Sequence, residues 1–94
     1  MPNAKNDIKS SITIEENRVR LKLYNPTDKD CVVSDAAITV FDPYDGSVVE
    51  REEFEKNQYF AANSSKEFVM YGHYSAYEAK YEFDIVPYNP LIPG

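Results

Sequence analysis

A strand–turn–strand signal in the middle of the chain limits its fold more than any other feature. In residues 36–49, AAITVFDPYDGSVV, Ile38 and Val40 alternate with their neighbours at the period of two expected of a β-strand. An Asp-Pro pair then suits the first two turn positions, and Gly46 can adopt the positive φ that closes a short hairpin loop. The stretch predicts an antiparallel β-hairpin.

Further stretches alternate between apolar and polar residues. Residues 18–23 alternate arginine or lysine with valine or leucine, and residues 77–85 alternate apolar or aromatic residues with charged ones. In residues 8–14, one face carries Ile8, Ser10, Ile12 and Ile14, and the residues between them are polar. Each pattern predicts a half-buried strand with one face towards a core. The residues expected to be buried on the inner faces are Ile12, Ile14, Val19, Leu21, Leu23, Ile38, Val40, Phe68, Tyr81, Phe83 and Ile85.

The remaining segments are predicted from turn residues and charge. Residues 31–33 resume strand character and run, with a kink near residues 34–35, into the hairpin. The charged run 50–56 favours an exposed edge strand, because charges protect an edge against unwanted pairing; a single helical turn is the alternative. Residues 61–65 are expected to form a loop, and residues 66–71 a further strand.

These strands define the predicted fold class. Short strands with turn signals every ~8–12 residues are typical of an all-β fold, a single antiparallel immunoglobulin-like β-sandwich of about seven strands. A small closed barrel is the alternative. We divide the chain into a flexible N-terminal arm over residues 1–7, the sandwich domain over 8–86, and a proline-rich extended tail over 87–94.

The charge of the chain limits its partners. A net charge of -6 and a single cysteine among 94 residues argue against direct nucleic-acid binding and against an internal disulfide. No apolar run approaches the ~20 residues of a membrane span, and no signal peptide is visible. We expect a cytoplasmic protein or the mature part of an exported one, with no small-molecule substrate and no cofactor.

Few residues offer catalytic or metal-binding chemistry. His73 is the only histidine, and we interpret it as a surface or hydrogen-bonding residue rather than a general base. Cys31 is interpreted as a small buried strand residue rather than a nucleophile. Asp42 and Asp45 flank the turn and could share Ca²⁺ with aspartates of residues 28–30, but turn-forming roles are favoured. The chain is therefore predicted to have no enzymatic activity and no metal site.

Three segments resemble one protein family. Leu23-Tyr24-Asn25-Pro26-Thr27, the segment from Phe41 to Val49 (FDPYDGSVV) and Asn63-Ser64-Ser65-Lys66-Glu67-Phe68 are similar to the matching segments of FxLYD-type bacterial immunoglobulin-like domains. The similarity covers about half of the chain. It implies a non-catalytic bacterial module and transfers no functional residues.

Tyrosine is the residue type that most suggests a contact surface. The chain has eight, and tyrosine offers a large, rigid, amphipathic surface at low entropic cost. We expect a module that binds another protein or self-associates through an edge strand or exposed tyrosines; the alternative is an acidic inhibitor that occupies the basic nucleic-acid site of a partner protein. The candidate interaction residues are Tyr44, Tyr59, Tyr71, Tyr88, Leu91 and Ile92.

Overall fold

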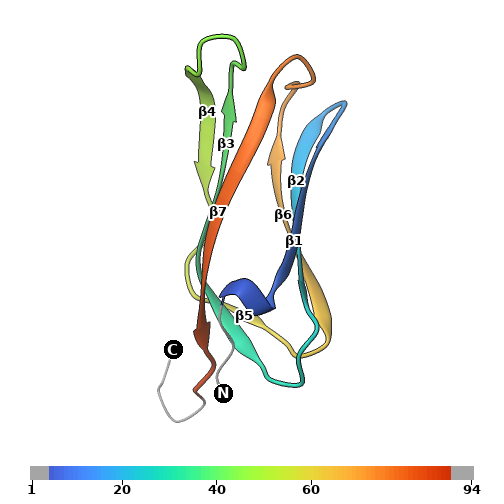
Figure 1. The fold of residues 1–94 in the computed structure, drawn as a ribbon, viewed down its shortest axis with the longest axis vertical. Coiled ribbons are helices and arrows are strands. Elements are labelled where there is room, and N and C mark those ends of the chain that lie inside the picture. The colour runs from blue at the N-terminus through green and yellow to red at the C-terminus, as the bar shows by residue number, and fades with distance from the viewer. Residues whose placement is uncertain (1–4, 90–94) are drawn as a thin grey trace.

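Residues 5–89 are described in the computed structural model, where seven strands form two antiparallel sheets (Figure 1). The first sheet has the order β1-β2-β6, with β1 at Lys9–Glu15, β2 at Arg18–Asn25 and β6 at Ser64–Tyr71. The second contains β3 at Cys31–Phe41, β4 at Val48–Glu53, β5 at Gln58–Phe60 and β7 at Glu78–Pro87. The predicted all-β sandwich is confirmed.

The second sheet is built around β3, the longest strand. One side of β3 pairs with β7 along its length, and the other side pairs first with β5 and then with β4. The pairing with β7 shifts register between Val33 and Asp35, which confirms the kink expected near residues 34–35. The charged run forms the edge strand β4 and not a helical turn.

The predicted hairpin connects β3 and β4. The amide of Asp42 donates to the carbonyl of Ser47 at 2.8 Å, and the amide of Gly46 donates to the carbonyl of Asp42 at 2.8 Å. Gly46 has a φ of 76°, the positive value that the turn requires. The local sequence therefore specifies this turn through hydrogen bonds and one glycine.

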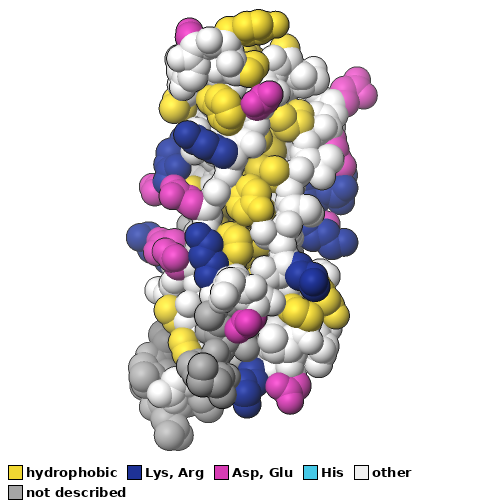
Figure 2. All heavy atoms as spheres, viewed as in Figure 1, with side chains coloured by type: hydrophobic (Ala, Val, Ile, Leu, Met, Phe, Trp, Pro, Cys, Tyr) yellow, Lys and Arg dark blue, Asp and Glu magenta, His cyan; other side chains and the backbone are white. Residues whose placement is uncertain are grey.

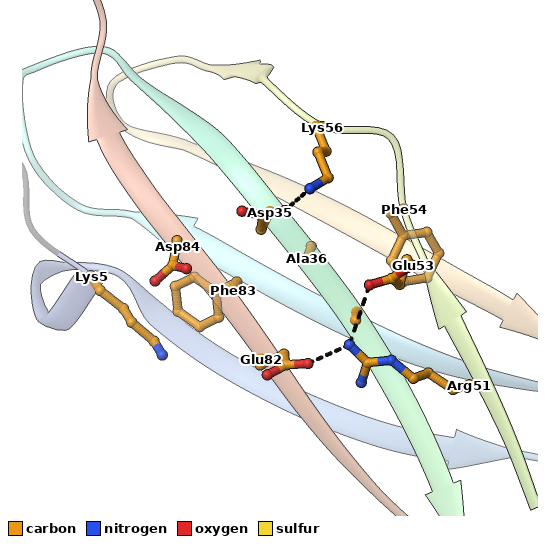
Figure 3. A pocket seen from close by; sticks show the side chains of 11 residues that line it. Lys5, Asp35, Ala36, Arg51, Glu53, Phe54, Lys56, Glu82, Phe83 and Asp84 are labelled. Carbon is orange, nitrogen blue, oxygen red and sulfur yellow. Dashed lines mark hydrogen bonds and ion pairs between the residues drawn. The ribbon is translucent and has the colours of Figure 1, made fainter.

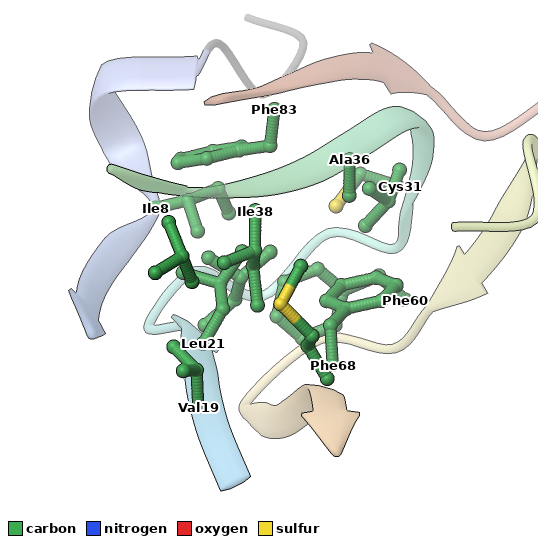
Figure 4. Close-up of a cluster of buried hydrophobic side chains, with 13 residues drawn as sticks. Ile8, Val19, Leu21, Cys31, Ala36, Ile38, Phe60, Phe68 and Phe83 are labelled. Atoms are coloured by element: carbon green, nitrogen blue, oxygen red, sulfur yellow. The ribbon is translucent and has the colours of Figure 1, made fainter. Parts of the chain in front are cut away.

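The core lies between the two sheets (Figure 4). Alternation correctly predicts the buried inner faces of β2, β3 and β6, together with Phe83 of β7. Alternation also predicts burial for four residues that are only partly buried, and for these the prediction is wrong. They are partly exposed because they lie on β1 and β7, along one side of the sandwich. These four residues are Ile12, Ile14, Tyr81 and Ile85.

The ends of the described chain differ in detail from the sequence-based boundaries. Residues Lys5–Asp7 form a single 3₁₀ turn, η1, in which the carbonyl of Lys5 accepts a hydrogen bond from the amide of the buried Ile8. Strand β6 begins at Ser64, directly after Asn63 with its φ of 53°, and β7 continues to Pro87, opposite Cys31. The candidates Leu91 and Ile92 lie outside the described residues.

Gly72, in the loop between β6 and β7, is expected to be intolerant of a side chain. Its φ is 150°, which L-residues rarely adopt, and a methyl group there would overlap the Tyr74 ring. We expect Gly72→Ala to lower the free energy of unfolding by about 1–3 kcal/mol. The control is Gly46→Ala, which also has positive φ but open space around it. Urea denaturation that gave the control an equal or larger loss would contradict the packing of Tyr74 on Gly72.

Candidate functional site: the open side of the sandwich

A β-sandwich exposes strand edges, and on one side of this molecule the edges are protected. On β4, Glu50 and Glu52 stand opposite Val40 and Ile38, so their carboxylates are on the core-facing side of the sheet. Inward-pointing charges are a known protection against edge-to-edge pairing. This edge is therefore poorly suited to accept another strand.

The β6 edge is guarded in a similar way. Lys66 stands opposite the buried Leu23, and its Nζ lies 3.4 Å from the carbonyl oxygen of Tyr59. The ring of Phe54, which follows β4, lies 5.1 Å from the ring of Phe68. An inward lysine and an aromatic contact between the sheets thus close this side of the sandwich.

The other two edges, β1 and β7, lack such protection. They flank the same side of the sandwich in Figure 1. Four of their core-facing residues are apolar but only half-buried: Ile12 and Ile14 on β1, and Ala79 and Tyr81 on β7. Figure 2 shows a stripe of apolar side chains running between the two sheets on this face. We call the surface between β1 and β7 the open groove.

The lower end of the open groove is hollow and bridged. The hollow has a volume of about 530 Å³, and Ile8, Tyr81 and Phe83 contribute its apolar lining. The hydroxyls of Ser10 and Tyr81 are hydrogen-bonded at 2.7 Å, linking β1 to β7. The Lys5 ammonium lies 5.2 Å from the centre of the Phe83 ring. The two sheets are therefore tied together at this end by η1 and one hydrogen bond.

The tyrosines proposed as contacts divide into two groups. Tyr44 and Tyr71 are 97% and 73% exposed, in or next to loops at the upper end of the molecule in Figure 1. Tyr59 and Tyr88 lie together, with ring centres 5.1 Å apart in an edge-on arrangement. A hydrogen bond to Asp30 raises the pKa of Tyr59. The structure thus brings only two of the four tyrosines together.

A second hollow, of about 380 Å³, lies beside the bulge of β3 (Figure 3). Four of its charged groups form two ion pairs: Arg51 Nη2 lies 2.5 Å from Glu82 Oε1, and Lys56 Nζ lies 3.0 Å from Asp35 Oδ1. These bonds raise the pKa of both basic groups. Histidine and cysteine are absent from its described lining.

The residues with the most reactive side chains lie apart. Cys31 is fully buried at the start of β3, 3.7 Å from Nδ2 of Asn25. His73 is exposed in the β6–β7 loop at the other end of the sandwich, and its Nδ1 lies 3.1 Å from the carbonyl oxygen of Glu16. Both placements agree with the structural roles predicted from the sequence.

No protein-family model, no curated protein and no solved structure matches this chain. Within residues 5–89, no helix is long and apolar enough to cross a membrane. The open groove is therefore interpreted from the geometry and chemistry of its own residues.

The turn aspartates are occupied by local hydrogen bonds. Asp42 Oδ1 accepts from the amide of Tyr44 at 2.8 Å, and Asp45 Oδ1 accepts from the amide and hydroxyl of Ser47 at 2.9 and 2.7 Å. The Ser47 bonds lower the pKa of Asp45. The loop with residues 28–30 lies at the opposite end of β3 (Figure 1), and the described residues contain no cluster of three metal-ligating side chains.

We therefore expect folding to be independent of calcium. Thermal melting in EDTA and in millimolar Ca²⁺ should give the same midpoint, because two hydrogen-bonded turn carboxylates do not provide the six to eight oxygen ligands that Ca²⁺ takes. Melting in Mg²⁺ at equal ionic strength is the control for general salt effects. A rise of more than a few degrees in Ca²⁺ alone would contradict this expectation.

Proposed function

We propose that this chain is a non-catalytic interaction module that binds an extended segment of another protein along the outer edge of β7. The observation that carries the proposal is that β7 is paired with another strand on one side only. β7 spans ten residues and, among the residues described, pairs only with β3. It also borders the open groove, where apolar side chains are half-exposed.

The physical basis is β-strand addition. An unpaired edge presents backbone N–H and C=O groups that an extended peptide can satisfy, and this pairing supplies affinity without a deep pocket. In the immunoglobulin-type order, the strand that corresponds to β7 has a further strand on its outer side. No described residue of this chain occupies that position. The edge is therefore the natural place for a strand from a partner.

Tyr88 extends the proposed contact surface beyond the end of β7. It follows the strand directly, is 44% exposed and packs edge-on against Tyr59. A partner segment that continues past Pro87 would meet Tyr88, whose ring is supported by Tyr59 from the other side of β3. Tyrosines of this kind contribute contact area at low entropic cost.

The similarity to FxLYD-type bacterial immunoglobulin-like domains is part of the same proposal. The similar segments include the β3–β4 hairpin and the end of β2, which have structural roles here. The resemblance rests on segments with structural roles, so it implies a non-catalytic module and points to no functional residues. We infer no partner from it.

The acidic-inhibitor alternative has less support. Such an inhibitor needs carboxylates gathered on one face without compensating cations. Here Glu15 bonds both Arg18 and Arg20, which lowers the pKa of Glu15, and Glu82 bonds Arg51. Carboxylates held by arginines of the same surface are poorly placed to imitate phosphates.

The proposal is tested by selecting displayed random peptides of about twelve residues against the full chain. Selected peptides should shift the NMR signals of β7 and β1, and their binding should be lost in Ala79→Arg, which places a bulky charge in the groove. Ala76→Arg is the matched control, because Ala76 is exposed in the β6–β7 loop. Circular dichroism verifies that both variants are folded. Peptides that bind elsewhere, or that bind Ala79→Arg unchanged, would refute the proposal.

A further inference from the structure

We infer that the strand bound at β7 is an amphipathic one, with apolar side chains that enter the open groove and lysine or arginine side chains on its outer face. This inference rests on the proposed function, because it specifies the partner segment for the same edge. It follows from the two faces of β7, which present different chemistry to a neighbouring strand.

The inner face of β7 requires an apolar partner. Ala79 and Tyr81 stand opposite the buried Val40 and Ile38, so they face the core, yet both are only half-buried. Across the groove, Ile12 and Ile14 of β1 are half-buried as well. A strand added to β7 would point alternate side chains into the space between these residues. Apolar side chains there would complete the burial of four residues that are now partly exposed to water.

The outer face of β7 requires a basic partner. Its outward side chains are Glu78, Lys80, Glu82 and Asp84, all exposed. Arg51 already bonds Glu82, so the carboxylates that chiefly face an added strand are those of Glu78 and Asp84. Lys80 already lies 5.4 Å from the centre of the Phe41 ring on the neighbouring strand. Side chains directly opposite on adjacent strands attract when their charges differ and repel when they match. The added strand is therefore favoured when its outward residues are lysine or arginine.

A second copy of β7 is the competing occupant. In antiparallel self-pairing that keeps inward residues opposite inward residues, centring on Tyr81 places Glu78 opposite Asp84 but Lys80 opposite Glu82. Centring on Glu82 places Glu82 opposite its own copy but Lys80 opposite Asp84. Each of these registers mixes repulsive with attractive pairs. A strand from a different protein with basic residues opposite Glu78, Glu82 and Asp84 sets no like charges against them.

The bridge at the lower end of the groove limits how far the strand extends. The Ser10–Tyr81 hydrogen bond and η1 already connect β1 to the lower half of β7. The inserted apolar side chains are thus expected beside Ile12, Ile14 and Ala79.

The probe for this inference is a labelled peptide of about nine residues in which valine alternates with lysine. Two comparison peptides are a scrambled one of the same composition, without alternation, and one that alternates valine with glutamate. Fluorescence anisotropy with the full chain at low salt should give the alternating valine–lysine peptide at least tenfold tighter binding than either comparison peptide.

Two double variants distinguish the contribution of the β7 charges to peptide binding from the contribution of the overall charge of the chain. Glu78→Gln with Asp84→Asn removes two carboxylates from the outer face of β7, and should weaken binding of the valine–lysine peptide about tenfold. Glu50→Gln with Glu52→Gln removes two carboxylates from β4, the opposite edge, and should leave binding unchanged.

Three results would overturn the inference. The first is equal binding of the scrambled peptide or an equal effect of the β4 pair, which would show non-specific attraction of a cation to an acidic protein. The second is a dimer of the free chain with protected β7 amides, which would make the occupant a second copy. The third is absence of saturable binding of the valine–lysine peptide. If displayed peptides of other composition still bound β7, the proposed function would stand while this inference failed.

Discussion

Replacing Leu21 with alanine is expected to lower the free energy of unfolding by about 2–5 kcal/mol. Leu21 is fully buried in β2, the middle strand of its sheet, with Ile12 on one side and Phe68 on the other. The substitution removes buried methyl groups and leaves a cavity that strands paired on both sides cannot collapse to fill. Urea denaturation of the two proteins measures the difference directly.

The matched control is Ile12→Ala. Ile12 is the direct neighbour of Leu21 in the sheet and faces the same side, but it is only half-buried beside the open groove. The loss of stability in Ile12→Ala should be clearly smaller. A half-buried side chain has less buried apolar surface to lose, and its removal leaves no closed cavity. A loss below ~0.5 kcal/mol for Leu21→Ala, or an equal loss for both, would show that the faces of the sheet are wrongly assigned.

Replacing Asn25 with alanine is expected to lower the free energy of unfolding by about 2–4 kcal/mol. Asn25 ends β2, is fully buried and holds two loops together through its side chain. Its Nδ2 donates to the carbonyls of Lys29 at 2.9 Å and Ala61 at 3.3 Å, while its Oδ1 accepts from the amide and hydroxyl of Thr27 at 3.0 and 2.7 Å. Alanine would remove these four bonds, together with the 3.7 Å bond from Nδ2 to Cys31 Sγ, and leave polar groups of the loops without them.

The control for Asn25 is Asn17→Ala, in the exposed β1–β2 turn. The bond that Asn17 forms with the Gly72 amide uses its backbone carbonyl, which the substitution keeps. We expect a change within ~0.5 kcal/mol for this variant. Thermal and urea unfolding of both variants should separate them, and a loss for Asn25→Ala as small as that of the control would refute the structural role of Asn25.

Much of the fold could be predicted from the sequence, because local signals and tertiary structure agree. The hairpin at Asp42 and Gly46 is specified by its own residues, and alternation along β2 assigns Val19, Leu21 and Leu23 to the core. Alternation reports which face of a strand points inward. It does not report whether another strand covers that face.

This limit explains why the open groove was missed. Ile12, Ile14, Tyr81 and Ile85 were expected to be buried because they alternate correctly, and each does face the core. Their partial exposure depends on the order of strands in space, which places β1 and β7 at the edges of the two sheets. A sequence signal was nonetheless present: these residues belong to the first and last predicted strands, which are candidates for sheet edges.

The contact between Tyr59 and Tyr88 also depends on topology. Tyr59 lies on β5 and Tyr88 directly follows β7, and these strands pair with the two sides of the same short segment of β3, where Cys31 stands opposite Phe60 on β5 and Pro87 on β7. Residues separated by almost thirty positions in the chain therefore meet at the end of one sheet. Composition indicated that tyrosines could form a contact surface, but only the strand pairing selects these two.

Residue-resolved amide hydrogen exchange along β7 is the most direct test of the central claim that its outer edge is open and accepts a strand. In a strand paired on one side, alternate amides bond the neighbour and the others point outward. In the dilute free chain, every second amide of β7 should exchange fast while the amides of β2 and β3 stay protected. With the valine–lysine peptide bound, the fast set should slow at least tenfold. The claim would be contradicted if the outward-pointing amides of β7 were already protected in the free chain. It would also be contradicted if they still exchanged fast with the peptide bound.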